Sequence, residues 1–387
     1  MPINAAVPSS PISPGPVKLE KAARSKELDG LRGIAALTVV FCHFFDLFPA
    51  GRWTAVWKIS PLYALIAGRE AVVVFFVLSG FALDRMYLKT RDAGYAGFAL
   101  RRILRIYAPY LGALAVAATA DYFLSTGYRS HFNPWFNQTW TVPFHWRDVW
   151  RHVAFLGVYN NLIFDTAFWS LIQEMRISLV FPLLFLFIAA KAASRQIGFA
   201  LLLVISGTLA TATFAKSTDL GDSVHFAGLF IFGIFISERK TRLAEWYRSL
   251  PSAWRSALTI FAALLFYYGR IVAHAVPAAY ASILDIPVGI GASGIIVLAF
   301  SSRRFSAFLD SRPIAWLGDV SYSLYLVHGT ILFGLVNLLN LAAPRCRLLA
   351  LYVPLALLAA AAFHVCVEKP LLYQSRKVTA RANAQQI

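Results

Sequence analysis

The stretch Leu28-Asp-Gly-Leu-Arg-Gly-Ile-Ala-Ala-Leu-Thr-Val-Val-Phe-Cys-His43 begins as a polar turn, becomes apolar, and then carries a histidine into an expected membrane core. Arg32 and His43 are eleven residues apart, close to three helical turns, so both lie on one helix face about 16 Å apart along the axis. Ala36 and Val39 lie between them on that face, and small residues there leave room for a groove. Because an ionisable residue in lipid costs free energy, we interpret this face as the centre of a functional site.

The composition of the whole chain is that of a polytopic membrane protein. The 387 residues are 58% hydrophobic and only 14% charged, which excludes an ordinary soluble domain. The three cysteines lie in or beside apolar segments and have neither a disulfide framework nor the paired spacing of a metal site, so no metal is expected. The formal charge of +17 suggests a nucleic-acid partner only if its distribution does not follow membrane topology.

The apolar segments predict an all-α membrane helix bundle of about ten transmembrane helices. The expected spans are roughly 29–49, 71–88, 103–123, 168–190, 197–215, 224–237, 256–274, 286–301, 317–338 and 348–366. With the N-terminus and C-terminus inside, 24 basic residues lie on the cytoplasmic side and nine outside. The positive charge therefore reflects the positive-inside rule, and we expect no nucleic-acid partner.

Two tails flank the expected membrane domain of residues 27–375, and one long external segment lies within it. Residues 1–26 are rich in Pro, Ser and Ala and predict a disordered cytoplasmic tail, and 376–387 predict a second cytoplasmic tail. The external segment 124–167 is long and rich in aromatic residues. It is either a lid or substrate-binding loop, or an aromatic belt that rests at the membrane interface.

His43 lies about fourteen residues into a span that enters from the cytoplasm, so we expect it in the outer half of the membrane. An imidazole with a pKa near neutral can take a proton from a hydroxyl. The alternative is a packing histidine hydrogen-bonded to a neighbouring helix.

A second group of polar residues, Phe168-Trp-Ser-Leu-Ile-Gln-Glu-Met-Arg176, opens the fourth span from outside. Ser170 and Glu174 lie four residues apart on one face, and Arg176 follows on an adjacent face. Glu174 reaches a depth similar to that of His43. A functional carboxylate and a structural ion pair between helices both fit this pattern.

A third group, Asp319-Val-Ser-Tyr-Ser-Leu-Tyr-Leu-Val-His328, lies in the ninth span. Ser321, Tyr325 and His328 form a polar stripe on an apolar helix, which must face the bundle interior or water. His328 also reaches the middle to outer half of the membrane. Three spans thus bring His43, Glu174 and His328 to comparable depths.

Arginines mark the opposite side of the membrane. Arg102 and Arg105 are one turn apart at the expected cytoplasmic mouth of the third span, a spacing that suits binding of phosphate oxygens. Ordinary contacts with lipid phosphates are the alternative. Ser79 and Gly80 of the second span favour close helix packing over catalysis.

Taken together, these motifs resemble the acyltransferase-3 family of integral membrane O-acyltransferases. The resemblance runs in order from about residue 27 to 373 and rests on Asp29-Gly-Leu-Arg-Gly with His43, Phe75-Phe-Val-Leu-Ser-Gly-Phe81, Arg102-x-x-Arg105, Trp169-Ser-Leu-x-x-Glu174, Ser321-Tyr-Ser-Leu-Tyr-Leu-x-His328 and Glu368-Lys-Pro370. It implies transfer of an acyl group, usually acetyl from cytoplasmic acetyl-CoA, to a hydroxyl of a glycan made or exported at the bacterial envelope. The corresponding location is the bacterial inner membrane.

The resemblance also implies roles for residues. His43 corresponds to the essential histidine of the family and Arg32 to its partner. Arg102 and Arg105 resemble the pair that engages the CoA donor. Glu174 and Trp169 belong to a motif whose role is less defined.

The residues and the resemblance lead to one mechanism. Acyl-CoA enters from the cytoplasm with its phosphates on Arg102 and Arg105 and its arm along the Arg32 to His43 face, and His43, oriented by Glu174 or His328, acts as general base. A covalent acyl-histidine is a second possibility. Around these residues, Trp169, Ser170, Tyr325 and Arg176 are expected to bind substrate or shape the site.

Two other classes of function fit the composition equally well. One is a transporter or flippase of a lipid-linked glycan, and the other is a structural membrane subunit. Binding of CoA would distinguish the enzyme from both.

Overall fold

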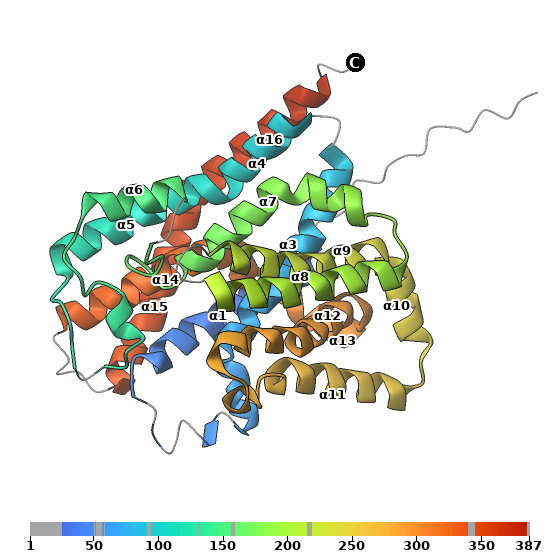
Figure 1. Ribbon diagram of the computed structural model, residues 1–387, viewed down its shortest axis with the longest axis horizontal. Coiled ribbons are helices and arrows are strands. Elements are labelled where there is room, and N and C mark those ends of the chain that lie inside the picture. Colours follow the sequence, from blue (N-terminus) through green and yellow to red (C-terminus); the bar gives the residue numbers. More distant parts are fainter. Residues whose placement is uncertain are drawn as a thin grey trace, which may run out of the picture.

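The computed structural model describes residues 25–49, 51, 56–57, 59–90, 94–130, 132–155, 159–214, 219–339 and 345–384. The described chain is built of helices and contains no strand, which confirms the expected all-α bundle (Figure 1). Of the expected N-terminal tail, residues 1–24 lie outside the described residues. The expected C-terminal tail continues the last helix up to Ala384.

The first half of the chain contains the first five expected spans and several shorter helices. Its helices are α1 (Lys26–Asp46), α3 (Gly68–Thr90), α4 (Gly94–Arg102), α5 (Ala108–Leu124), α6 (Trp146–Ala154), α7 (Phe168–Ile188) and α8 (Ala193–Phe214). A short 3₁₀ helix, η1 (Pro61–Leu65), precedes α3, and another, η4 (Phe136–Gln138), lies in the external segment.

The second half continues the bundle with antiparallel neighbours. Its helices are α9 (Leu220–Glu238), α10 (Lys240–Ser249), α11 (Ser252–Tyr268), α12 (Asp285–Ser301), α13 (Arg303–Leu309), α14 (Arg312–Leu338), α15 (Arg345–Phe363) and α16 (Lys369–Ala384). Two 3₁₀ helices, η5 (Ala273–Ala275) and η6 (Ala278–Leu284), link α11 to α12.

Nine helical segments of the described chain are long and apolar enough to cross a membrane. The remaining expected span is α11, whose 17 residues reach about 25 Å at 1.5 Å per residue. Arg270, just after α11, pairs with Asp285 at 2.6 Å, and Asp285 also pairs with Arg69 near the start of α3. The C-terminal end of α11 therefore lies at the outer end of the bundle, and the described helices fit the expected ten crossings.

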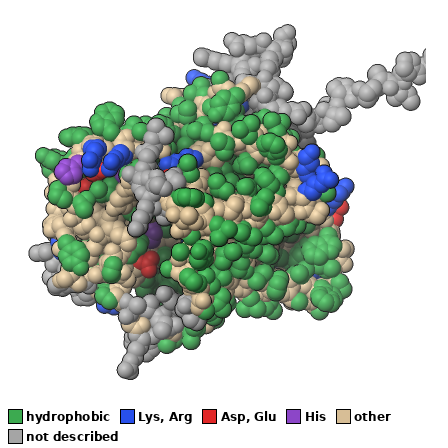
Figure 2. Space-filling view, in the orientation of Figure 1, with side chains coloured by type: hydrophobic (Ala, Val, Ile, Leu, Met, Phe, Trp, Pro, Cys, Tyr) green, Lys and Arg blue, Asp and Glu red, His purple; other side chains and the backbone are tan. Residues whose placement is uncertain are grey.

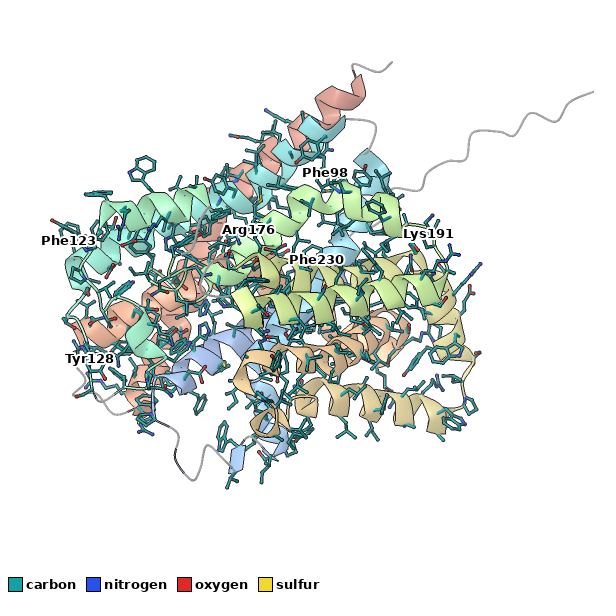
Figure 3. All side chains as sticks on the ribbon, viewed as in Figure 1. Phe98, Phe123, Tyr128, Arg176, Lys191 and Phe230 are labelled. Carbon is teal, nitrogen blue, oxygen red and sulfur yellow. The ribbon has the colours of Figure 1, made fainter. Side chains whose placement is uncertain are left out.

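The two ends of the bundle carry different surface helices. Figure 1 shows α6 at one end and α10 at the other, and Figure 3 places Tyr128 and Phe123 near the first end and Lys191 near the second. Between these ends, hydrophobic side chains cover a broad face of the molecule, with Lys and Arg gathered toward the ends (Figure 2). This is the surface expected of a membrane-spanning protein.

Glycines set the tightest contacts of the core. A Cβ on Gly33 of α1 would lie 2.6 Å from the backbone N of Gly318 on α14, so a side chain there would push these helices apart. A Cβ on Gly80 of α3 would lie even closer to the backbone of Phe230 on α9. The packing role predicted for Gly80 is thereby confirmed, because small residues let membrane helices approach closely.

Two π-helical turns interrupt long helices at the inner side of the site. They are η3 (Ile103–Tyr107) between α4 and α5, and η7 (His364–Glu368) between α15 and α16. Helix α16 packs along α4 and against η3 (Figure 1). Such turns are frequent at functional sites because they shift the faces that the flanking helices present.

Candidate active site

His43 and His328 meet in the interior of the bundle. Nε2 of His328 lies 2.9 Å from Nδ1 of His43, and the two rings are stacked with centroids 5.0 Å apart. His328 is fully buried, whereas His43 is partly accessible. The shared depth expected for these two histidines thus becomes a direct contact between α1 and α14.

The hydrogen bonds of this pair assign its protons. Nδ1 of His328 is 3.0 Å from the carbonyl oxygens of both Leu324 and Tyr325, and a carbonyl can only accept, so this nitrogen carries the proton. Neutral His328 then accepts at Nε2, and Nδ1 of His43 donates to it. Nε2 of His43 therefore keeps its lone pair, the form that a general base requires.

The external segment covers the histidine pair from outside. Oγ1 of Thr166 lies 3.2 Å from Nδ1 of His43, and the ring of Trp135 is 4.8 Å from the His43 ring. Segment 124–167 thus contacts His43 directly through Trp135 and Thr166.

Asp165 anchors this segment and was not predicted from the sequence. One carboxylate oxygen accepts from the Ala167 N–H, and the other accepts from the backbone N–H and hydroxyl of Thr330. A Cβ on Gly329 would meet the carboxylate at 2.4 Å, so this position requires glycine. Asp165 thereby links the external segment beside Thr166 to the turn of α14 that follows His328.

Asp165 makes the stability of the protein pH-dependent. Burial raises its pKa from 3.8 to about 7, although its hydrogen bonds from Ala167 and Thr330 act in the opposite direction. Between these two values the folded state binds more protons than the unfolded state, so stability falls as pH rises, by up to ~4 kcal/mol. We expect the midpoint temperature of thermal unfolding to decrease as the pH rises from 4 to 7, and Asp165→Asn to reduce this slope.

The control for Asp165→Asn is Asp310→Asn, since the Asp310 side chain is 47% exposed. This variant should keep the slope of the parent. An Asp165→Asn protein with the unchanged pH dependence would contradict the assignment.

A cavity of about 880 Å³ extends from the inner side toward the histidines. Helix α3 lines it from Val72 to Lys89, a length of about 25 Å at 1.5 Å per residue. The expected groove along Ala36 and Val39 is not formed, because these side chains are 0% and 1% exposed within the core. The elongated space instead lies between α3 and its neighbours.

Arg102 lies deeper than the cytoplasmic mouth where it was expected. Its guanidinium is 3.5 Å from Glu174 and donates to Ser178 at 2.9 Å, while Ser79, halfway along α3, donates to Glu174 at 2.8 Å. Glu174 therefore belongs to the arginine level of the cavity and does not orient His43. Of the two orienting residues considered, the structure brings only His328 to His43.

Arg105 and Arg32 also line the cavity. Arg105 is exposed to it and has no ion-pair partner within the described chain. Arg32 is held by Asp29 at 3.2 Å. Of the three arginines Arg32, Arg102 and Arg105, only Arg105 therefore has no ion-pair partner within the described chain.

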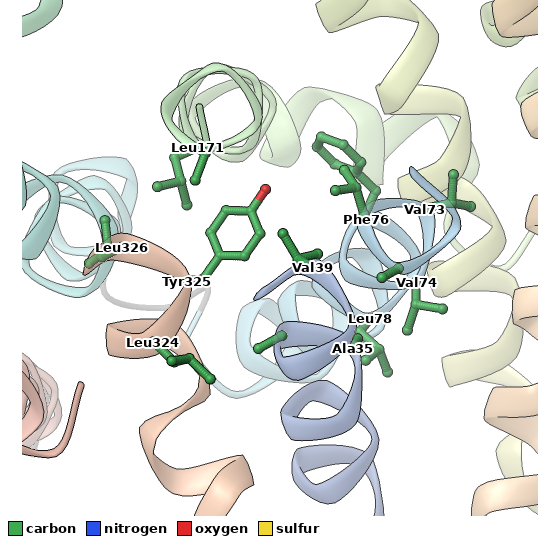
Figure 4. Close-up of a cluster of buried hydrophobic side chains, with 14 of the residues drawn as sticks. Ala35, Val39, Val73, Val74, Phe76, Leu78, Leu171, Leu324, Tyr325 and Leu326 are labelled. Atoms are coloured by element: carbon green, nitrogen blue, oxygen red, sulfur yellow. The ribbon is translucent and has the colours of Figure 1, made fainter. Parts of the chain in front are cut away.

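The cavity ends at Ser170 and Tyr325, whose hydroxyls are 2.7 Å apart. Figure 4 shows the Tyr325 ring between α7, α1 and α3, near Leu171 and Val39. The ring centroid of Tyr325 is 5.9 Å from that of His328. His43 does not line the cavity, so the Ser170–Tyr325 pair separates the cavity from the histidines.

Arg176 and Trp169 lie away from the cavity. Arg176 donates to Asp219 at 2.7 Å and to the Phe155 carbonyl at 2.7 Å, so it links α7 to α9 and to the end of α6 (Figure 3). Trp169 packs on Phe226 and under the Arg69 guanidinium. Arg176 therefore forms an interhelical ion pair, the structural alternative considered for this segment, and its partner is Asp219.

Within the described residues, no group of three or more His, Cys, Asp or Glu side chains could hold a metal ion.

Comparison with known proteins gives one match. A family model described as "Acyltransferase domain" matches residues 25–367, which includes the histidine pair, Glu174 and the arginines Arg32, Arg102 and Arg105. No curated protein and no solved structure matches the chain.

Proposed function

Because the chain belongs to the acyltransferase-3 family of membrane acyltransferases, we propose that it moves an acyl group, acetyl in the simplest case, from cytoplasmic acyl-CoA to a glycan hydroxyl. The acceptor is an envelope or exported glycan, free or lipid-linked, and the location is the bacterial inner membrane. The observation that carries the proposal is the unprotonated Nε2 of His43. His328 fixes the proton of His43 on Nδ1, and the two histidines lie beyond the end of an elongated, cation-lined cavity.

The dimensions of the site support a CoA thioester as donor. Gly68 of α3 lies against the side chain of Cys42, next to His43, and Ser79 of α3 lies at the level of Glu174 and Arg102. These two levels are eleven residues apart, about 16 Å along the helix. An extended pantetheine arm spans a distance of this order, so phosphates near Arg105 and a thioester near His43 are compatible.

The residues define a direct transfer. Nε2 of His43 accepts the proton of the acceptor hydroxyl as the hydroxyl oxygen bonds to the thioester carbonyl carbon. The C–S bond breaks, and the departing CoA sulfur takes up the proton from His43. In the second route, Nε2 of His43 attacks the thioester carbonyl carbon, the C–S bond breaks and the CoA thiolate leaves, which gives an acyl-histidine. The acceptor hydroxyl then attacks the acyl carbon, the N–C bond breaks, and the hydroxyl proton passes to the CoA thiolate.

The Tyr325 side chain lies between the donor cavity and His43, the proposed general base. Its hydroxyl is hydrogen-bonded to Ser170 at the end of the cavity, and Phe75 packs edge-on against its ring. We infer that this ring moves aside when the thioester enters. Afterwards its hydroxyl is available as a donor to the thioester oxygen.

Substitution of Arg105 tests whether the donor is an acyl-CoA. We expect Arg105→Ala to raise the KM for acyl-CoA about tenfold, because a charge-assisted contact with a phosphate is lost. Arg105→Lys should recover part of the loss, since it keeps the charge without the planar guanidinium. The measurement is transfer of radiolabelled acetyl from acetyl-CoA by purified protein in nanodiscs.

A transporter or flippase of a lipid-linked glycan is the alternative function. It has no need of CoA, so a protein that binds neither acetyl-CoA nor CoA would overturn the proposal. The acceptor and the acyl group would follow from mass spectrometry of envelope glycans made with and without the gene.

A further inference from the structure

The inner mouth of the cavity carries three cations for which the proposed transfer gives no role. Arg85 and Lys89 lie on the last two turns of α3, and Lys369 begins α16. All three line the cavity and are exposed. None forms an ion pair within the described part of the chain.

Two of the carboxylates that line the cavity are held by other groups. Glu368 accepts from the Ser323 hydroxyl at 2.6 Å and lies 2.9 Å from Nδ1 of His364. Deeper in the cavity, Glu174 is held by Arg102. The mouth therefore presents positive charge inside a concave surface, where field lines are focused and an anion is attracted.

An aromatic ring lies beside the cations. Tyr373, one turn after Lys369 on α16, lines the cavity and is 60% exposed. The Lys377 ammonium is 4.5 Å from the centroid of this ring. An exposed tyrosine ring next to unpaired cations is suited to a ligand that joins a planar base to a phosphate.

The spacing along α3 relates this mouth to the rest of the site. Arg85 is six residues and Lys89 ten residues beyond Ser79, which places them about 9 and 15 Å from the Arg102 level. A CoA molecule whose pyrophosphate lies near Arg105 would extend its adenosine 3′-phosphate in this direction.

We propose that Arg85, Lys89 and Lys369, with the Tyr373 ring, bind the adenosine 3′-phosphate end of the acyl donor. This assignment rests on the proposed function, because it needs CoA as donor. Phosphates of lipid headgroups share the same chemistry. All three cations line the cavity. This position favours the acyl donor over lipid headgroups as their ligand.

The test compares CoA with 3′-dephospho-CoA, which lacks only the phosphate in question. Affinities are measured by calorimetry for the parent and for the double variant Arg85→Ala/Lys89→Ala, in nanodiscs of neutral lipid and again with anionic lipid. For the parent we expect CoA to bind about tenfold more tightly than 3′-dephospho-CoA. For the double variant the ratio should fall to about twofold or less.

The matched control is Arg242→Ala. Arg242 is an exposed cation of α10, at the same end of the bundle but outside the cavity lining. This variant should keep the tenfold ratio. Unchanged binding of 3′-dephospho-CoA by the double variant would also establish that it is folded.

The possible failures are distinguishable. If neither ligand binds the parent, the proposed function and this inference fail together. If both bind the parent equally, the donor stands and the 3′-phosphate site is wrong. If the double variant keeps the ratio and loses only anionic-lipid binding, the three cations bind headgroups and the inference is overturned.

Discussion

His43→Ala is expected to lower kcat for acyl transfer by about 10² to 10⁴-fold, because the general base of the reaction is lost. The affinity for CoA should stay close to that of the parent, since His43 lies beyond the Ser170–Tyr325 pair and does not line the donor cavity. The change thus separates chemistry from donor binding. It is measured by initial rates with acetyl-CoA together with calorimetry of CoA binding.

Two further variants sharpen this result. His145→Ala removes an exposed histidine from the same external segment and should leave the rate unchanged. His328→Ala removes the Nε2 acceptor of the His43 Nδ1 proton and leaves only the Thr166 hydroxyl, 3.2 Å away. It should lower kcat and alter the pH–rate profile, because the proton is no longer fixed on Nδ1 by His328. A folded His43→Ala protein with the parental rate would refute the mechanism.

Glu174→Ala is expected to destabilise the protein by about 3 kcal/mol, because it leaves the buried Arg102 charge with only the Ser178 hydroxyl. The Ser79 hydroxyl loses its acceptor as well. Donor affinity should fall too, since Arg102 would then be free to adopt other positions in the cavity. Thermal unfolding in detergent and CoA titration measure the two effects separately.

Removing both partners distinguishes structure from function. Arg102→Met/Glu174→Leu replaces the pair by apolar side chains of similar size and should recover most of the lost stability, as buried pairs often do. It should not recover donor binding. Equal stability of the parent and Glu174→Ala would mean that the pair contributes nothing to the fold.

The sequence predicts the shared depth of the two histidines correctly and the depth of Glu174 incorrectly. Counting residues from the ends of the spans brought His43, Glu174 and His328 to similar depths. The structure joins the two histidines but places Glu174 beside Arg102 and Ser79, at a level about 16 Å from the histidines. Counting residues gives the position along one helix, whereas relative depth and the choice of neighbour also depend on the shift, rotation and tilt of helices that are far apart in the chain.

Asp165 lies in a segment where sequence reasoning has little to work with. It precedes α7 in a loop without periodicity, and its partner Thr330 becomes a neighbour only after the external segment folds over α14. The one available clue is that an acidic residue stands in an apolar context, Ile163-Phe-Asp-Thr-Ala-Phe168. This pattern does not predict that the partner of Asp165 is Thr330.

Apolar length and the placement of Lys and Arg determined by themselves that this protein is a membrane-spanning helix bundle, since the bilayer imposes those two constraints on any chain. The ordered motifs also determined the acyltransferase-3 family. The tertiary structure alone decided that His328 orients His43, that Arg102 is buried in an ion pair, and that Tyr325 closes the cavity. These features depend on which helix faces pack together, and that packing is set by close backbone contacts such as Gly33 on Gly318, which a linear pattern of residues does not encode.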